Sequence, residues 1–241
     1  MLEREFGYKP PIPESLQSEY ETALSKVVRW KTGDWEDSNR ETDMDHVAGM
    51  FIVLENLNGH CPTLHSDIDL EVVKHMMYVH DAGEIAVDDL AYDIDNYDVL
   101  RPEHKRKEYI LARWMFKTHL EDRQIRSKAL RLYERYIAQR NDDKEALLAE
   151  FIDKLQGARF GFKNKFNARA TGMKAVDRKI RFDRTVQKFL VLPLKPLLKC
   201  VSPETQDSLK TFLKGELESF STFGYQKEAT PHIENLDAIL Q

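Results

Sequence analysis

Residues 67–84 have the sequence DIDLEVVKHMMYVHDAGE, and this stretch decides the fold. One set of side chains recurs at helical spacing, with Glu84 one turn further on: Val73, Met76, Met77 and His80. This spacing predicts an α-helix over about 67–80 that turns one face toward a core. The last position of the predicted helix on that face is His80, and Asp81 follows it directly. Packing of an apolar core alone does not explain two polar residues at the end of this face.

The same spacing continues along the chain and predicts an all-α fold. Further helices are expected at about 14–29, 43–57, 102–119, 122–140, 142–160, 173–190, 203–220 and after residue 230. Pro102, Pro203 and Pro231 are predicted to open helices, with Ser202 as the cap before the second of them, and Gly59 is predicted to cap the helix that begins at Asp43. Only 10 Gly and 9 Pro occur in 241 residues. These are too few for an all-β sandwich or barrel, in which the chain turns every 8–12 residues or so.

Composition also bears on where the protein works. No apolar run approaches the roughly 18 residues that a membrane span requires, and the first residues lack the apolar region of a secretory leader. Cys61 and Cys200 are too few for a disulfide framework, which favours free thiols in a reducing compartment. We therefore expect a cytoplasmic protein without a membrane partner.

Two further polar residues lie on predicted helices. His46 shares a face with Met50, Val53 and Leu57, so it points where core residues point. One such histidine is usually a hydrogen-bonded core residue, but His46 and His80 together, beside Asp81, favour metal ligation. Asp153 lies about 170° from the main apolar stripe of its helix. Its own face carries small or neutral residues, which let a neighbouring helix approach, so the helix is expected to be buried on two sides: Ala146, Ala149, Gln156 and Gly157. Spacing alone leaves a surface role and a ligand role open for Asp153.

The segment 158–189 is strongly basic. It holds ten Lys or Arg and two Asp, a balance of +8 in a chain whose net charge is −5. Five phenylalanines are interleaved with these charges: Phe160, Phe162, Phe166, Phe182 and Phe189. A solvated helix face above a phenylalanine stripe is the favoured interpretation, and nucleic-acid binding is the alternative.

The histidines and carboxylates, taken in order, resemble a known metal site. His46, the pair His80-Asp81 and Asp153 resemble the H…HD…D site of the HD-domain phosphohydrolase superfamily. Residues 80–90 resemble the HDxxExxxxD segment of its 5′-deoxyribonucleotidase-like branch, with Glu84 and Asp89 in the acidic places.

Other parts of residues 20–160 extend the resemblance to that branch. Arg29-Trp30 matches the pair that contacts the substrate phosphate, and residues 152–155 match the Asp-Lys element of the last ligand. Residues 40–46 resemble the approach to the first ligand, with Asp45 in place of the usual Glu.

The resemblance implies an all-α HD-domain helical bundle over residues 1–165, with a C-terminal helical extension, 166–241, packed on the same domain. It implies one divalent ion (Mn, Co, Fe, Zn or Mg) held by the H…HD…D residues named above. Glu84 would orient or deprotonate the attacking water, and Asp89 would act near the leaving oxygen. Arg29 and Trp30 would bind the phosphate. The implied activity is that of a phosphomonoesterase acting on (deoxy)nucleoside 5′-monophosphates.

Two other functions are consistent with the sequence. A phosphodiesterase or pyrophosphohydrolase of the same superfamily could use His104 and His119 as ligands of a second metal. A nucleic-acid-binding protein could use residues 158–189 and carry a vestigial site. Related enzymes are commonly dimers, and one charged helix holds more apolar bulk than a single stripe needs, so a homodimer is expected: Tyr109, Trp114, Met115 and Phe116.

Overall fold

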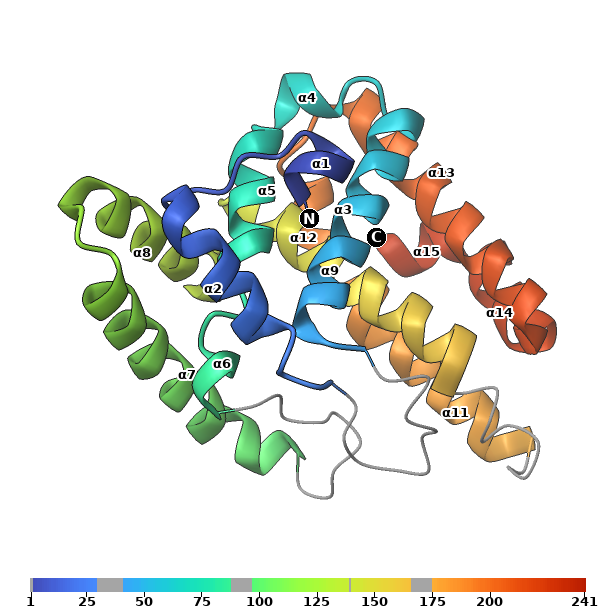
Figure 1. Cartoon of the computed structure of the whole chain (residues 1–241). Coiled ribbons are helices and arrows are strands. Elements are labelled where there is room, and N and C mark those ends of the chain that lie inside the picture. Colours follow the sequence, from blue (N-terminus) through green and yellow to red (C-terminus); the bar gives the residue numbers. More distant parts are fainter. Residues whose placement is uncertain (1, 30–40, 88–96, 139, 166–174) are drawn as a thin grey trace. The chain divides into compact units, whose positions relative to one another are not determined.

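The computed structural model describes residues 2–29, 41–87, 97–138, 140–165 and 175–241, and its elements are helices (Figure 1). Within these ranges there is no strand, only an isolated antiparallel bridge between Val28 and Thr42. The predicted all-α class is confirmed. No helix among these residues has the length and apolar character needed to cross a membrane.

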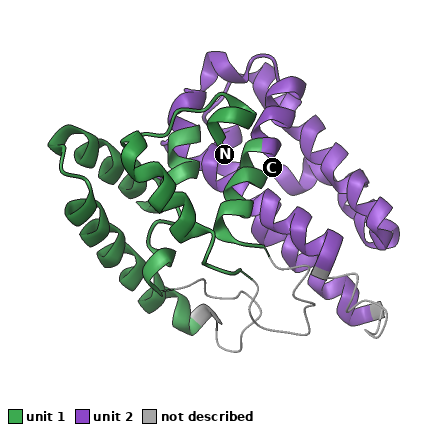
Figure 2. Ribbon diagram, viewed as in Figure 1, with its two compact units in different colours: residues 1–51, 74–138 green, residues 52–73, 139–241 purple. Residues whose placement is uncertain are grey.

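The chain divides into two compact units (Figure 2). Unit 1 comprises residues 1–51 and 74–138, and unit 2 comprises residues 52–73 and 139–241. Two helices run from one unit into the other, α3 (Asp43–His60) and α5 (Leu70–Val79). The sequence-based boundary at residue 165 stays a prediction.

The described residues of unit 1 form five helices besides its parts of α3 and α5. They are α1 (Leu2–Phe6), α2 (Glu14–Leu24), α6 (Glu84–Val87), α7 (Tyr97–His119) and α8 (Arg123–Ala138). A cluster of aromatic side chains, Tyr8, Tyr20, Phe51 and Tyr78, lies at its centre.

In the part of unit 2 that the structure describes lie the remaining helices and three short π-helical turns. They are α4 (Leu64–Asp67), α9 (Lys144–Phe160), η2 (Gly161–Lys165), α11 (Ala175–Thr185), η3 (Val186–Val191), α12 (Leu192–Leu198), α13 (Pro203–Phe220), η4 (Ser221–Tyr225), α14 (Gln226–Glu234) and α15 (Leu236–Leu240). Phe162 and Phe182 of the basic segment are buried and contact the rings of Phe220 and Tyr225, so they belong to the core of this unit.

Several predicted helix boundaries were wrong. Pro102 and Pro231 lie inside α7 and α14, because each proline removes only one backbone bond and the helix continues on both sides of it. Gly59 lies inside α3. Among the described residues the left-handed glycines are Gly7, at φ 59° after α1, and Gly224, at φ 88° before α14. The first predicted helix ends at Leu24, five residues early, since the chain beyond it pairs with residues 41–43.

The cap at Ser202 is confirmed, since its side chain accepts a bond from the Thr205 amide at the start of α13. Both cysteines are free thiols.

Candidate metal centre

The start of α3 is anchored by a short backbone pairing. The Arg29 amide donates to the Glu41 carbonyl at 2.8 Å, and the Asp43 amide donates to the Val27 carbonyl at 3.0 Å. Thr42 and Asp45 then close a reciprocal cap, in which each side chain accepts from the other's amide, at 3.0 and 3.1 Å. Asp45, the residue that departs from the family pattern, therefore caps the helix that carries His46.

The two predicted histidine ligands of unit 1 lie together in its interior. The rings of His46 and His80 have centroids 5.5 Å apart, and the two residues are 0% and 5% exposed. His80 Nδ1 lies 2.8 Å from the Met77 carbonyl oxygen. A carbonyl only accepts, so Nδ1 carries the proton and Nε2 presents its lone pair. That atom lies 2.9 Å from Asp81 Oδ2.

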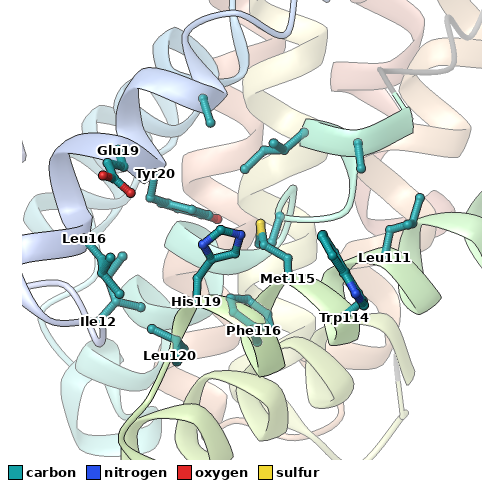
Figure 3. Close-up of a pocket in the computed structure, with 14 residues that line it drawn as sticks. Ile12, Leu16, Glu19, Tyr20, Leu111, Trp114, Met115, Phe116, His119 and Leu120 are labelled. Atoms are coloured by element: carbon teal, nitrogen blue, oxygen red, sulfur yellow. The ribbon is translucent and has the colours of Figure 1, made fainter.

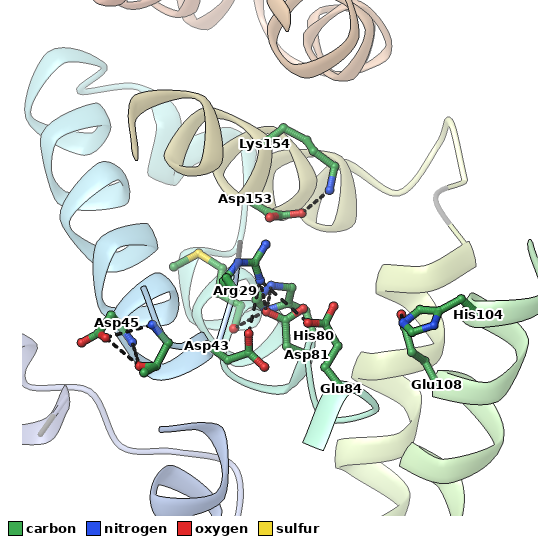
Figure 4. Close-up of polar contacts among 12 residues, drawn as sticks. Arg29, Asp43, Asp45, His80, Asp81, Glu84, His104, Glu108, Asp153 and Lys154 are labelled. Atoms are coloured by element: carbon green, nitrogen blue, oxygen red, sulfur yellow. Dashed lines mark hydrogen bonds and ion pairs between the residues drawn. The ribbon is translucent and has the colours of Figure 1, made fainter. Parts of the chain in front are cut away.

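Three carboxylates gather beside these histidines (Figure 4). Oxygens of Asp43, Asp81 and Glu84 lie within 4.8 Å of one another, and all three residues are buried. Arg29 points into the group, with Nη1 2.9 Å from Asp81, 3.5 Å from Asp43 and 4.0 Å from Glu84. Three buried acids around one guanidinium leave an excess of negative charge, which a divalent cation would neutralise.

The ionisation of Asp81 follows from these neighbours. Burial alone would raise the pKa of its carboxyl group. The adjacent His80 when its ring is protonated, then Arg29, and a protonated His46 more than offset this, and the pKa is held well below its usual range. Asp81 is therefore a carboxylate throughout the physiological range, the form that a metal ligand requires.

A close approach between the turn at Gly83 and α7 adds charged residues that the sequence did not predict. A Cβ atom on Gly83 would lie 2.5 Å from the Glu108 carbonyl oxygen, so only glycine allows the two segments to come this near. Lys105 Nζ lies 2.6 Å from Glu108 and 4.0 Å from Glu84. Lys105 is half-exposed, and its partial burial would lower its pKa, but the two carboxylates outweigh this and raise the pKa.

Lys105 and Glu108 escaped prediction because a Lys and a Glu three residues apart are ordinary on an exposed helix. Only the glycine in the His80–Glu84 turn hinted at a packed neighbour. Asp43 escaped because an acid in the first turn of a helix normally interacts with the helix dipole.

The other predicted site residues lie in unit 2 or outside the described residues. Asp153 lies on α9 in unit 2, buried and 2.6 Å from Lys154 Nζ. Its neighbours Ala146, Ala149 and Gln156 are buried too, so this helix is covered on the face opposite its main stripe. That Asp153 joins the histidines of unit 1 stays a prediction. Trp30 and Asp89 lie outside the described residues.

The histidines considered for a second metal have other neighbours. His104 Nε2 lies 3.1 Å from Glu108 Oε1, and His119 is exposed beside Trp114. Neither belongs to a group of potential metal ligands among the residues that the structure describes.

An apolar pocket of about 320 Å³ lies in unit 1 (Figure 3). The segment that carries Asp81 and Glu84 contributes Ala82, Ile85 and Ala86 to its wall, while α2 and α7 supply Tyr20 and Trp114 among others. Within this segment, Asp81 and Glu84 thus belong to the acidic cluster, whereas Ala82, Ile85 and Ala86 line the pocket.

The donor set fits a divalent transition metal. With Nδ1 protonated, Nε2 of a neutral His80 directs a lone pair at the Asp81 carboxylate oxygen 2.9 Å away. Two such acceptors repel unless a cation or proton lies between them. Imidazole and carboxylate together suit Mn, Fe, Co or Zn, and the bond from Nδ1 to a carbonyl is the usual support for a ligating histidine.

A helical protein with a buried histidine–carboxylate cluster of this kind is built to bind a divalent metal. Comparison with protein families identifies the chain more closely: the model of the HD domain matches residues 23–188. The chain belongs to the HD-domain family, whose members are in general metal-dependent phosphohydrolases. Neither the curated proteins nor the solved structures contain a match.

Proposed function

We propose that this HD-domain protein is a phosphomonoesterase that removes phosphate from (deoxy)nucleoside 5′-monophosphates. The observation that carries the proposal is the burial of Glu84 in one cluster with Asp81, one turn beyond His80. Glu84 is not one of the proposed metal ligands, yet its carboxylate is held beside them, where it can accept or donate a proton.

The metal would be held by His46, His80, Asp81 and, as the resemblance implies, Asp153 of unit 2. When bound, a divalent ion polarises a phosphoryl oxygen and lowers the pKa of water. His80 is oriented for this task by its bond to Met77, and Asp81 is ionised before any metal arrives.

Glu84 is the proposed general base. Its carboxylate lies on the same short segment as Asp81, so it can accept a proton from the attacking water while that water is aligned with the phosphorus atom. Lys105, at 4.0 Å, offsets part of the negative charge around Glu84 without forming a tight pair with it. Asp89 is proposed to protonate the leaving oxygen or hold the sugar hydroxyl.

Arg29 is proposed to bind the substrate phosphate together with Trp30. Its side chain is 14% exposed, and its guanidinium contacts Asp81 through Nη1. A planar guanidinium has further N–H groups that can bind two phosphate oxygens at once. The contact with Asp81 would hold this fork at the metal centre before substrate enters.

A substrate panel tests the activity. The metal-loaded protein is incubated with nucleoside 5′- and 3′-monophosphates, a dinucleotide diester and nucleoside triphosphates, and released phosphate or pyrophosphate is measured. We expect the 5′-monophosphates to be hydrolysed fastest, and Glu84→Gln to suppress this activity at unchanged metal content. Faster turnover of the diester or the triphosphates would replace the proposal with the phosphodiesterase or pyrophosphohydrolase alternative.

We further propose that the protein is a cytoplasmic homodimer. Ile110 and Trp114 lie one turn apart on α7 and are 52% and 59% exposed, whereas Phe116 of the same helix is buried. Exposed apolar side chains at this spacing favour burial against a second chain. Light scattering that gives the mass of one chain at micromolar concentration would contradict the dimer.

A further inference from the structure

The helices α7 and α8 of unit 1 pack side by side (Figure 1). A concavity of about 300 Å³ is lined by residues of both helices. Four arginines line it, together with Ser127 and Glu134: Arg113, Arg123, Arg126 and Arg131. The proposed chemistry of the metal centre uses none of these residues.

The spacing on α8 explains why the arginines converge. Arg123 lies at the centre of the face of α8 that lines the concavity, and Arg126 and Arg131 lie at its two edges. Leu132 is buried on the opposite side of the helix. Arg113 comes from the neighbouring α7. The concavity is therefore built from regular helices, which hold its side chains more firmly than a loop would.

Positive charge in the concavity is largely unbalanced. Residues 123–135 hold five Lys or Arg and one acid, although acidic residues outnumber basic ones in the whole chain. The acid, Glu134, accepts from the Tyr109 hydroxyl at 3.1 Å and lies 4.0 Å from Arg113 Nε. Arg123, Arg126 and Arg131 form no ion pair within the part of the chain that the structure describes.

Two of the guanidinium groups are nevertheless held in place. Arg126 donates to the Leu120 carbonyl at 3.3 Å, and Arg131 donates to the Ser127 hydroxyl. Each of these bonds uses one of the five N–H donors of a guanidinium, so most donors stay available to a ligand. Oriented arginines with spare donors are the groups that recognise phosphate oxygens two at a time.

We propose that this concavity binds a compact oligophosphate anion, such as pyrophosphate or the phosphate chain of a nucleotide. Its volume lies at the lower end of the range of small-molecule sites, roughly 300–1,000 Å³, which suits a few phosphate groups. The arginines surround one hollow and do not form a track along the surface, which favours a compact anion over a nucleic-acid backbone.

Calorimetric titration of pyrophosphate into the as-purified full-length chain tests this site. We expect saturable binding that weakens between 50 and 200 mM salt, because part of the attraction is screened. The double variant Arg126→Gln/Arg131→Gln should weaken binding at least about tenfold, since it removes charge-assisted hydrogen bonds to the ligand. If this variant does not fold, the exposed Arg123→Gln takes its place, with a smaller loss expected.

A matched control separates a site from general electrostatics. Lys117→Gln/Lys128→Gln removes the same charge from exposed positions of the same two helices, outside the concavity, and should change affinity less than about twofold. Asp81→Ala should retain binding, because the metal centre is not involved. Equal losses in the two double variants, loss of binding in Asp81→Ala, absence of saturable binding, or a clear preference for single-stranded oligonucleotides over pyrophosphate would each overturn the proposal.

Discussion

The two units bury charge in different ways. Unit 1 brings Asp43, Asp81 and Glu84 into one cluster around Arg29. Unit 2 distributes its buried or half-buried charges as separate contacts between helices: Arg159 with Glu216, Arg178 with Glu228, Asp183 with His232, and Asp67 with Ser202. Like charges placed together cost stability, so such a cluster is expected where chemistry requires it, whereas separate pairs join elements of the fold.

The aromatic residues follow the same division. In unit 2, Phe182 stacks on Tyr225 with ring centroids 5.5 Å apart, and the guanidinium of Arg178 lies 4.5 Å from the Tyr225 ring. In unit 1, the ring of His80 contacts the rings of His46 and Tyr136, with centroids 5.5 and 5.3 Å apart. Substitutions in unit 1 should therefore change activity first, and substitutions in unit 2 should change stability first.

The largest effect is expected from Asp81→Ala. Losing a ligand carboxylate should lower activity by at least about 10³-fold, equivalent to several kcal/mol of transition-state stabilisation. Metal content, measured by elemental analysis, should fall with it. The control Asp183→Ala removes a paired carboxylate from unit 2 and should leave metal content unchanged while lowering the melting temperature. Loss of metal in both variants would erase the contrast between the units.

Glu84→Gln should separate chemistry from metal binding. The amide keeps the size and hydrogen-bonding reach of the side chain but cannot accept the proton, so turnover should drop by roughly 10²–10⁴-fold. Metal content should not change, and the melting temperature should stay level or rise because one like charge leaves the cluster of Asp43 and Asp81. Full activity in metal-loaded Glu84→Gln would exclude the proposed base even though the family assignment stands.

Some parts of this centre could be predicted from the sequence because they depend on local geometry. Helical spacing alone turns His46 and His80 toward a core, and both are buried. The small residues around Asp153 indicated a second packed face of α9, and Ala146 and Ala149 are fully covered there. A pattern of spacing reports which face of a helix is covered, but it does not report what covers it.

The rest depends on contacts between distant segments. Lys105 lies near Glu84 because the backbone at Gly83 approaches Glu108. The spacing of apolar residues along the sequence does not predict this approach. The wrong helix start at Pro102 has a different cause. Proline is unfavourable inside a helix but not forbidden, so a proline alone does not fix where a helix begins.

Two glycine substitutions compare the packing of the units directly. In Gly83→Ala the new Cβ would meet backbone atoms of α7 at 2.5–2.8 Å, so the variant should lose about 1–3 kcal/mol of unfolding free energy, as overpacked sites do. In Gly215→Ala, within α13 of unit 2, nothing lies within 4 Å, and the better helix former should add about 0.5–1 kcal/mol. Thermal or urea denaturation measures both. A neutral Gly83→Ala would show that the close approach to Glu108 is not a constraint.

The smallest effect is expected at the start of α13 in unit 2. Asp67 accepts hydrogen bonds from the Ser202 amide and hydroxyl at 3.0 and 2.7 Å, and bonds from Thr205 and Ser202 lower the pKa of its carboxyl group. Asp67→Asn should lower the free energy of unfolding by about 0.5–1 kcal/mol after allowance for solvent screening, in the range of a lost helix cap.

The contribution of Asp67 to stability should depend on pH. Because the folded pKa lies below the unfolded value near 3.9, this contribution is complete above about pH 5 and is lost as the pH falls through the folded pKa. The difference in melting temperature between wild type and Asp67→Asn should therefore shrink from pH 6 toward pH 3. If the difference in melting temperature did not change with pH, Asp67 would act through its shape and not through its charge. This contact in unit 2 would then not depend on ionisation, in contrast to the cluster of unit 1.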